Sequence, residues 1–230
     1  MKHCTHIFFD LDHTLWDYNY NARKVLADMY IHFGLKEKTN TSLDGFQKLF
    51  FKINALLWHR FNLELIHRED IRQDRFNLIL NQCNGSDIRL ASELGDYFLY
   101  HCPRQEKLIE GADLILAYLE SKYELYVITN GFDDVQWIKL KSSGLTKYIR
   151  DMFTSETIGF RKPSKEIFEY ALAETKGTPN LSIMIGDNPY TDIVGASSAG
   201  MTPVLFNPDF KTKSDCEIQV SDYFELMKLL

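Results

Sequence analysis

Two carboxylates, Asp10 and Asp12, follow directly on an apolar run at residues 7–9 (IFF). Such a run is typical of a short strand buried on both faces of a parallel sheet, so the carboxylates begin where the strand ends. Because side chains alternate along an extended chain, both carboxylates can point into one crevice. They repel each other unless a cation joins them or one takes a proton. A divalent metal, with one carboxylate as nucleophile and the other as general acid and base, would meet that requirement.

A calcium-binding loop is the first alternative for this motif. An EF-hand loop also begins Asp-x-Asp, but it requires Gly at its sixth position and Glu at its twelfth, where this chain has Leu15 and Asn21. We therefore reject the calcium loop. A pair of solvated turn aspartates stays open on this motif alone, because Asp and Thr are ordinary strand-end and cap residues.

A second strand end offers groups that bind phosphate. The run at residues 125–128 (LYVI) predicts a strand, and it is followed by Thr129, Asn130 and Gly131. A hydroxyl, an amide and a glycine that allows close backbone approach suit a phosphate group. Thr129 could instead be a simple turn residue.

Charged residues occur at two further places in the C-terminal half. Lys162 lies just before a helical pattern that begins near Pro163, a residue favoured at the first helical position. An apolar run at residues 183–185 leads into Asp187 and Asp192. A solvated surface lysine and helix N-cap aspartates are the structural alternatives. Chance explains the ordered set poorly, and we interpret the groups as one active site.

These motifs resemble those of a known family. The sequences DLDHT, ITNG, RKPSKEIF and GDNPYTD, in this order, are similar to the four signature motifs of the haloacid dehalogenase-like (HAD) hydrolase superfamily. Residues 123–192 resemble most the bacterial nucleotidase branch, whose members dephosphorylate pyrimidine nucleoside 5′-monophosphates. Many members carry a helical cap between the first and second motifs, so the resemblance also implies an inserted cap domain.

The distribution of patterns predicts an α/β fold with a helical insertion. From about residue 20 to residue 102 apolar residues recur at helical spacing, with loops expected at 34–41 and 82–86. After Pro103 the patterns alternate, predicting helices at 112–121, 134–143, 164–176 and 193–199 and strands at 125–128, 152–154, 183–185 and 204–206. We predict a doubly wound, mostly parallel sheet in a Rossmann-like core at residues 1–16 and 104–230, and an all-helical cap at 17–103.

Composition limits the classes of function. The net charge of the 230 residues is −6, which disfavours a nucleic-acid polymer as partner but not a small phosphate ester. No apolar stretch approaches the roughly 18 residues of a membrane span, and the N-terminus lacks a signal pattern, so we expect a cytoplasmic protein without membrane association. The four cysteines are far apart and form no C-x-x-C pair, so neither a metal cluster nor a disulfide framework is expected.

The predicted chemistry follows from what phosphoryl transfer requires: an in-line nucleophile, charge neutralisation and protonation of the leaving oxygen. Asp10 is the predicted nucleophile, since carboxylates can form aspartyl phosphates. Asp12 is predicted to protonate the leaving oxygen and then to activate water. Mg²⁺ prefers oxygen ligands, and we expect it to be held by Asp10, Asp187 and the main-chain carbonyl of Asp12.

The remaining predicted site residues bind phosphate or balance charge. We expect the Thr129 hydroxyl and the main-chain N–H of Asn130 to bind phosphate oxygens. Lys162 is expected to offset the negative charge between nucleophile and substrate. Asp192 is expected to support Lys162 or a water on the metal.

Several alternatives to this function stay open. Dehalogenation is rejected, because a halide leaving group needs no proton donor and the chain retains Asp12. The preferred function is a small-metabolite phosphatase acting first on nucleoside 5′-monophosphates. A sugar phosphate or phosphoglycolate phosphatase, a phosphomutase and a non-catalytic phosphate-binding regulatory protein are the alternatives. His13 stands where many of these phosphatases have Gly, and it could be an exposed loop residue or could contact the substrate.

Overall fold

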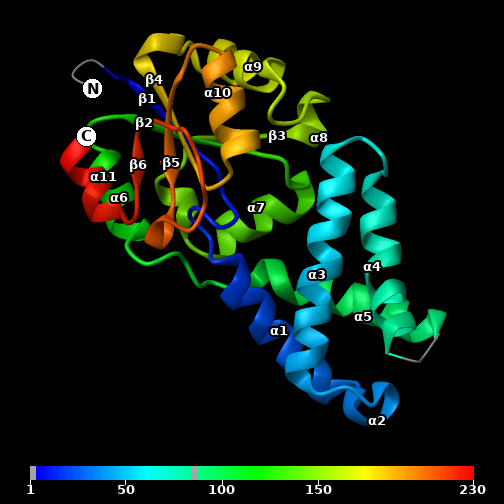
Figure 1. Cartoon of the computed structure of the whole chain (residues 1–230). Coiled ribbons are helices and arrows are strands. Elements are labelled where there is room, and N and C mark those ends of the chain that lie inside the picture. The colour runs from blue at the N-terminus through cyan, green and yellow to red at the C-terminus, as the bar shows by residue number, and fades with distance from the viewer. Residues whose placement is uncertain (1–3, 84–86) are drawn as a thin grey trace. The chain divides into compact units, whose positions relative to one another are not determined.

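The computed structural model describes residues 4–83 and 87–230 (Figure 1). The chain forms two compact units, the first comprising Met1–Tyr18 and Gln105–Leu230 and the second comprising Asn19–Arg104. The second unit is therefore inserted into the first along the chain. Within the described ranges, no helix is both long enough and apolar enough to span a membrane.

A six-stranded sheet forms the centre of the first unit. Its strands are β1 (His6–Phe9), β2 (Glu124–Thr129), β3 (Asp151–Thr154), β4 (Ser182–Gly186), β5 (Thr202–Phe206) and β6 (Gln219–Val220). The strand order is β3-β2-β1-β4-β5-β6, and every pairing is parallel. The chain runs outward from β1 to β3 and then returns to continue on the other side with β4. This is the predicted doubly wound α/β fold, and such sheets bind ligands at the carboxyl ends of the strands beside the reversal.

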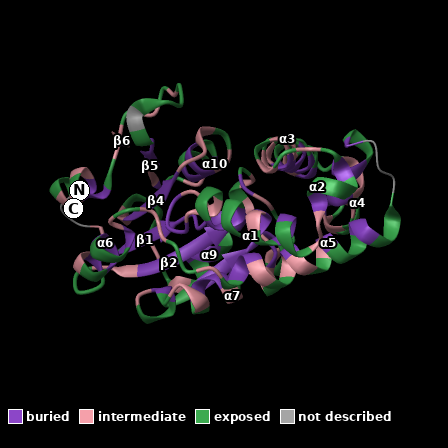
Figure 2. Ribbon diagram, turned by 90° about the horizontal axis from the view of Figure 1, so that it is seen from below, coloured by how far each residue is buried: buried purple, intermediate pink, exposed green. Residues whose placement is uncertain are grey.

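Strand β1 lies in the middle of the sheet because its residues can be buried on both faces. All four of its residues are buried, and Figure 2 shows β1 and its neighbour β2 coloured as buried. Phe9 is in register with Val127 of β2 and Ile185 of β4. The residues that follow these positions therefore come together at one edge of the sheet.

Helices precede, connect or follow the strands of the first unit. They are α6 (Ala112–Leu119), α7 (Asp133–Ser142), α8 (Ser155–Ile158), α9 (Lys165–Thr175), α10 (Val194–Ser198) and α11 (Tyr223–Leu229). The predicted helices after Pro103 correspond to α6, α7, α9 and α10, and the predicted strands correspond to β2 to β5. The sequence patterns predicted neither β6 nor α11.

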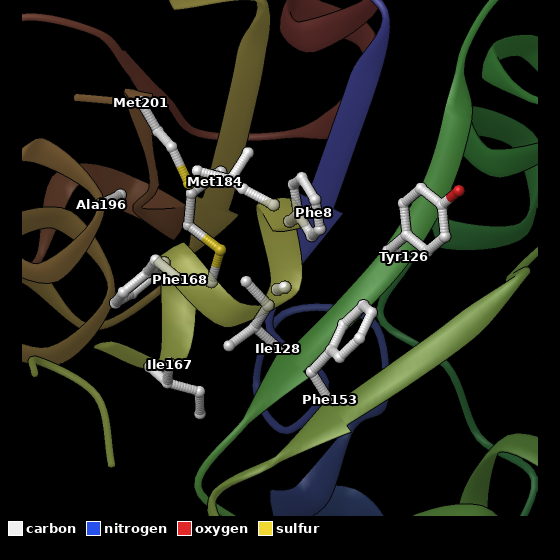
Figure 3. Close-up of a cluster of buried hydrophobic side chains, with 11 residues drawn as sticks. Phe8, Tyr126, Ile128, Phe153, Ile167, Phe168, Met184, Ala196 and Met201 are labelled. Carbon is white, nitrogen blue, oxygen red and sulfur yellow. The ribbon is translucent and has the colours of Figure 1, made fainter. Parts of the chain in front are cut away.

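A hydrophobic cluster joins one face of the sheet to α9 and α10 (Figure 3). Phe8 of β1 stacks on Tyr126 of β2, with ring centroids 5.3 Å apart. Phe168 of α9 and Met184 of β4 are fully buried in the same cluster. This packing fixes the strands from which the polar residues at the sheet edge project.

The described part of the second unit is helical. Its helices are α1 (Tyr18–His32), α2 (Leu35–Thr39), α3 (Leu43–Asn62), α4 (Arg68–Gln82) and α5 (Ile88–His101). Phe50 of α3 lies 5.9 Å from Phe76 of α4 and 4.8 Å from Phe98 of α5, measured between ring centroids. These aromatic side chains form a core of the unit's own.

The predicted loop at residues 34–41 is wrong, because it contains α2. Gly34 and Asn40 take left-handed backbone conformations at the two ends of this helix, with φ values of 60° and 50°. Gly and Asn are typical of turns, so their presence favoured a loop over the short helix between them. Leu35 of this helix is buried. The other predicted loop, at 82–86, lies partly outside the described residues.

Candidate active site

Polar side chains follow β1, β2 and β4 at the same edge of the sheet. Asp10 follows β1, Thr129 ends β2, and Asp187 follows β4. Because these strands are parallel neighbours, their carboxyl ends meet. This edge, beside the reversal of winding, is the candidate active site.

Lys162 lies between two of the carboxylates. Its Nζ atom is 2.7 Å from Asp10 Oδ1 and 2.6 Å from Asp192 Oδ1. It also donates a hydrogen bond of 2.9 Å to the main-chain carbonyl of Ile128. Only 2% of the surface of Lys162 is exposed, and Asp10 and Asp192 are buried as well. Lys162 is a buried cation shared by two carboxylates, so the surface-lysine alternative is wrong.

Burial and mutual repulsion shift the ionisation of this cluster. Burial raises the pKa of Asp10 to about 7, because the attraction of Lys162 does not offset the loss of solvent and the repulsion of Asp192 and Asp187. Burial, followed by repulsion from Asp192, raises the pKa of Asp187 to about 7. Burial alone would lower the pKa of Lys162, but its two carboxylate partners raise it above the usual value. The cluster therefore holds more potential negative charge than one lysine neutralises.

The carboxylates of this cluster could hold a metal ion. Asp10, Asp187 and Asp192 each offer an oxygen, and these oxygens lie within 4.8 Å of one another. Asp192 already uses both of its oxygens, since Oδ1 contacts Lys162 and Oδ2 accepts a 3.0 Å hydrogen bond from the main-chain N–H of Asn188. Asp10 and Asp187 are therefore the better candidates for direct ligands. An all-oxygen donor set with surplus negative charge fits Mg²⁺.

A tight turn after β4 places Asp192 beside the lysine. The side chain of Asn188 caps the π-helical turn Pro189–Ile193 and accepts a 3.2 Å hydrogen bond from the main-chain N–H of Thr191. A Cβ atom on Gly186 would lie 2.2 Å from Asp192 Oδ2. Glycine at this position thus provides the space that the Asp192 carboxylate occupies.

Asp12 has a separate set of partners on α7. Lys139 Nζ is 2.7 Å from both carboxylate oxygens of Asp12, and Gln136 Nε2 donates to Oδ2 at 3.1 Å. The same Gln136 nitrogen donates to Thr129 Oγ1 at 2.8 Å. The ammonium of Lys139 also lies 4.7 Å from the ring centroid of Trp16. Asp12 therefore belongs to a different charge pair from Asp10, although only Leu11 separates them in the chain.

The turn after β2 supports both charge pairs. The Asn130 side chain accepts from the main-chain N–H of Lys162 at 2.8 Å and donates to its carbonyl at 2.9 Å. Thr129 Oγ1 accepts from the main-chain N–H of Gly131 at 3.0 Å. A Cβ atom on Gly131 would lie 2.2 Å from Gln136 Nε2. The sequence patterns predicted a phosphate contact for Asn130, and the structure adds that its side chain holds the Lys162 backbone.

The backbone at His13 is left-handed, with a φ of 64°. Its main-chain N–H donates to the carbonyl of Trp16 at 3.0 Å, and its ring centroid lies 5.2 Å from that of Tyr18. Glycine adopts this conformation without steric cost, whereas histidine does not. Glycine would therefore suit this position better than histidine on conformational grounds.

The sequence patterns did not predict three residues that support the site: Gln136, Lys139 and Tyr223. Tyr223 of α11 donates a hydrogen bond to the main-chain carbonyl of Thr14, whose hydroxyl donates to Asp187 Oδ1 at 3.4 Å. Gln136 and Lys139 are one turn apart in a predicted helix that follows the phosphate-binding turn, which is a signal available in the sequence. Nothing in the sequence pattern points to Tyr223.

Comparison with known proteins defines the family. The family model described as haloacid dehalogenase-like hydrolase matches residues 4–200. The chain therefore belongs to the haloacid dehalogenase-like hydrolase family. The superfamily resemblance of the four motifs is confirmed.

Individual relatives cover most of the chain. HAD-hydrolase YfnB of Bacillus subtilis is 31% identical over 92% of this chain and 87% of its own. Pyrimidine 5′-nucleotidase PynA of Streptococcus pneumoniae is 27% identical over 97% of this chain and 94% of its own. Glyceraldehyde 3-phosphate phosphatase of Methanothermobacter thermautotrophicus is 32% identical over 88% of this chain and 85% of its own. The crystal structure of Bacillus subtilis YfnB bound to magnesium matches with a TM-score of 0.87 at 26% identity, covering 99% of this chain and 98% of the other. PynA supports the resemblance to the nucleotidase branch.

Proposed function

We propose that the protein is a Mg²⁺-dependent phosphatase that hydrolyses small phosphate monoesters through an aspartyl-phosphate intermediate. The observation that carries the proposal is the buried cluster at the carboxyl edge of the sheet, where Lys162 contacts Asp10 and Asp187 lies within metal-sharing distance. A nucleophile, a balancing cation and a metal ligand are thus in one place. Positioning and charge stabilisation are what phosphoryl transfer requires.

The first step transfers the phosphoryl group to the protein. A carboxylate oxygen of Asp10 attacks phosphorus, and the bond between phosphorus and the ester oxygen breaks. Asp12 gives its proton to that oxygen, so the leaving group departs as an alcohol. Asp10 then carries an acyl phosphate, and Asp12 is a carboxylate balanced by Lys139.

The second step releases phosphate. Asp12 takes a proton from a water molecule, and the water oxygen attacks phosphorus. The bond between phosphorus and Asp10 breaks, which restores the Asp10 carboxylate and leaves Asp12 protonated for the next cycle. The same residue therefore acts first as acid and then as base.

Thr129 is suited to bind a phosphate oxygen. Its Oγ1 atom accepts hydrogen bonds from Gly131 and Gln136, which occupy its two lone pairs. The hydroxyl proton is then the group that it can offer to a ligand. Lys162 would offset the charge brought by the phosphate at the nucleophile.

Asp10, Asp187 and the main-chain carbonyl of Asp12 would hold Mg²⁺. When bound, the metal supplies positive charge that offsets the carboxylates and the phosphate oxygens. The raised pKa values of Asp10 and Asp187 support this assignment, because a buried surplus of carboxylates favours a cation. The crystal structure of the relative YfnB is bound to magnesium, which supports the choice of metal.

Nucleoside 5′-monophosphates are the proposed substrates, and the similarity to the pyrimidine 5′-nucleotidase PynA supports them. The inserted helical unit, Asn19–Arg104, is proposed to act as a cap that excludes water from the acyl phosphate. Such a cap suits a free metabolite rather than a polymer. A sugar phosphate is the second candidate substrate, because glyceraldehyde 3-phosphate phosphatase is also a relative.

The test is a panel of phosphate esters assayed with Mg²⁺ and again with excess chelator. We expect a pyrimidine monophosphate to show higher kcat/KM than ribose 5-phosphate, glyceraldehyde 3-phosphate or phosphoglycolate, and the chelator to abolish activity reversibly. A preference for one of the other esters would refute the nucleotidase assignment alone. If none of the esters released phosphate, the proposed phosphatase activity would be refuted.

A further inference from the structure

We propose that Gln136 and Lys139 are positioning residues that hold the Asp12 carboxylate beside Thr129. The two residues are one helical turn apart on α7, so they present their side chains on one face of the helix. The inference rests on the proposed function, because it concerns the proton transfers that Asp12 performs there. It adds a determinant of catalysis that lies outside the four sequence motifs.

The amide of Gln136 connects the carboxylate to the phosphate-binding hydroxyl. Its nitrogen is 3.1 Å from Asp12 Oδ2 and 2.8 Å from Thr129 Oγ1, so both oxygens lie within hydrogen-bonding distance of one atom. The carboxylate is thereby kept next to the place where a phosphate oxygen would bind. A proton donor must be there to reach the leaving oxygen.

The orientation of this amide is itself informative. Gln136 is fully buried, and its Oε1 atom has no hydrogen-bond partner among the residues that the structure describes. An unpaired buried acceptor is unfavourable, because it has lost its hydrogen bonds to water. Reversing the amide would direct this oxygen at the Asp12 carboxylate, which would be worse. The orientation of the amide is therefore set by its nitrogen, which donates hydrogen bonds to Asp12 and Thr129.

Lys139 fixes the carboxylate from the other side. It contacts both oxygens of Asp12 at 2.7 Å, which restricts rotation of the carboxylate about its own axis. Lys139 is buried, and its ammonium also faces the rings of Trp16 and Tyr18 at 4.7 and 5.7 Å. A cation held on these sides has little freedom to move. The Asp12 side chain remains 26% exposed, so holding it in this way leaves it accessible.

The consequence is that α7 sets the rate of the steps that need a proton. Misplacing a reacting group by about 1 Å can cost about 100-fold in rate. Without Lys139 or Gln136 the Asp12 carboxylate would be free to rotate away from the leaving oxygen. Substrates with a poor leaving group would suffer most, because they depend on the proton from Asp12.

The first experiment compares two substrates in one set of variants. We expect Lys139→Met to lower kcat about 10- to 100-fold for a pyrimidine monophosphate, which has an alkyl leaving group. For an activated aryl phosphate we expect a loss of no more than about threefold when the first step limits the rate. KM should change little for either substrate, and Lys139→Arg should restore most of the activity. Lys141→Met, at an exposed lysine of the same helix, is the matched control and should have no effect.

The second experiment tests whether Lys139 acts through Asp12. Adding Lys139→Met to Asp12→Asn should cause no further loss of kcat, because the group being positioned is already gone. Gln136→Met should give the same pattern as Lys139→Met and replaces it if circular dichroism shows that the lysine variant is unfolded. Equal losses for aryl and alkyl esters, or losses that multiply in the double variant, would overturn the positioning role. A wild-type protein inactive on both esters with Mg²⁺ would instead refute the proposed phosphatase, and the positioning role with it.

Discussion

The surroundings of Asp10 and of Asp12 differ in charge and in exposure. The side chain of Asp10 is 12% exposed, and it shares Lys162 with Asp192 while Asp187 lies nearby. The side chain of Asp12 is 26% exposed and has a lysine of its own. One region holds several carboxylates for one cation, whereas the other holds one carboxylate for one cation.

This difference shows how two carboxylates two residues apart can take different roles. Burial and like charges raise the pKa of Asp10 to about 7, and a metal ion would relieve that repulsion. The Asp12 carboxylate is balanced without a metal and stays accessible. Because the two carboxylates differ in burial and in charge balance, changes in the two regions should have different effects.

The largest expected effect follows from Asp10→Asn. An amide cannot act as the nucleophile and is a weaker metal ligand, so kcat should fall by at least about 10,000-fold, or about 5.4 kcal/mol. Phosphate release should be measured with a pyrimidine monophosphate and with an aryl phosphate, and both should lose activity equally. Glu174→Gln, at an exposed carboxylate of α9, is the control and should stay active. Retention of a tenth of the wild-type kcat would refute the nucleophile assignment.

Lys162→Met should be the most destabilising change in the site. It leaves two buried carboxylates without their cation, and breaking such a pair costs about 3–5 kcal/mol. Urea unfolding should show a smaller loss for Lys139→Met, because its partner Asp12 is more exposed. Adding Asp192→Asn should recover part of the loss caused by Lys162→Met. Equal losses for the two lysines would remove the contrast between the regions.

Asp12→Asn should separate substrates by their leaving groups. We expect kcat to fall about 100-fold for an alkyl phosphate, or about 2.7 kcal/mol, since the proton donor is removed. In single-turnover experiments, release of an aryl alcohol should be much less affected, because that leaving group needs little protonation. Similar losses for both esters would contradict the general-acid role.

The metal-free protein should become less stable as pH rises from about 4 to about 7. Asp10 and Asp187 have folded-state pKa values raised to about 7, against about 3.9 for an unfolded aspartate, so the folded state binds more protons in this range. The stability that these two carboxyl groups contribute is fully present below the unfolded-state pKa of about 3.9. It is lost as the pH rises through about 7. Urea unfolding with chelator should show a shallower pH dependence for Asp187→Asn than for wild type. An unchanged slope in Asp187→Asn would show that this carboxyl group does not titrate as inferred.

The smallest effect is expected for His13→Gly, next to Asp12. Glycine relieves the left-handed strain, and its greater freedom in the unfolded chain offsets part of the gain, so stability should rise by less than about 1 kcal/mol. Lys176→Gly, at a left-handed residue after α9, should give a similar gain and serves as control. An unchanged KM in His13→Gly would identify His13 as a loop residue, and a raised KM would identify a substrate contact.

The residues that the sequence predicted best are those that follow strands. Asp10, Thr129 and Asp187 could be placed together because parallel neighbouring strands end at one edge. For the partners of Asp12, the sequence shows only that Gln136 and Lys139 are one turn apart in a predicted helix. Choosing the face of α7 that meets the sheet requires the three-dimensional packing. Tyr223 was inaccessible for another reason, since α11 follows a stretch without a recognisable pattern. The catalytic roles of the motif residues stay predictions, whereas their proximity is a property of the structure.

Direct detection of the acyl phosphate tests the central claim. Asp12→Asn should accumulate the intermediate when mixed with an aryl phosphate and Mg²⁺, because the first step proceeds while the base for the second is missing. Acid quenching, proteolysis and mass spectrometry should then find one added phosphoryl group on the peptide that contains Asp10, and none when Asp10→Asn is also present. Release of the aryl alcohol without a phosphorylated peptide, or a phosphoryl group on another residue, would contradict the mechanism.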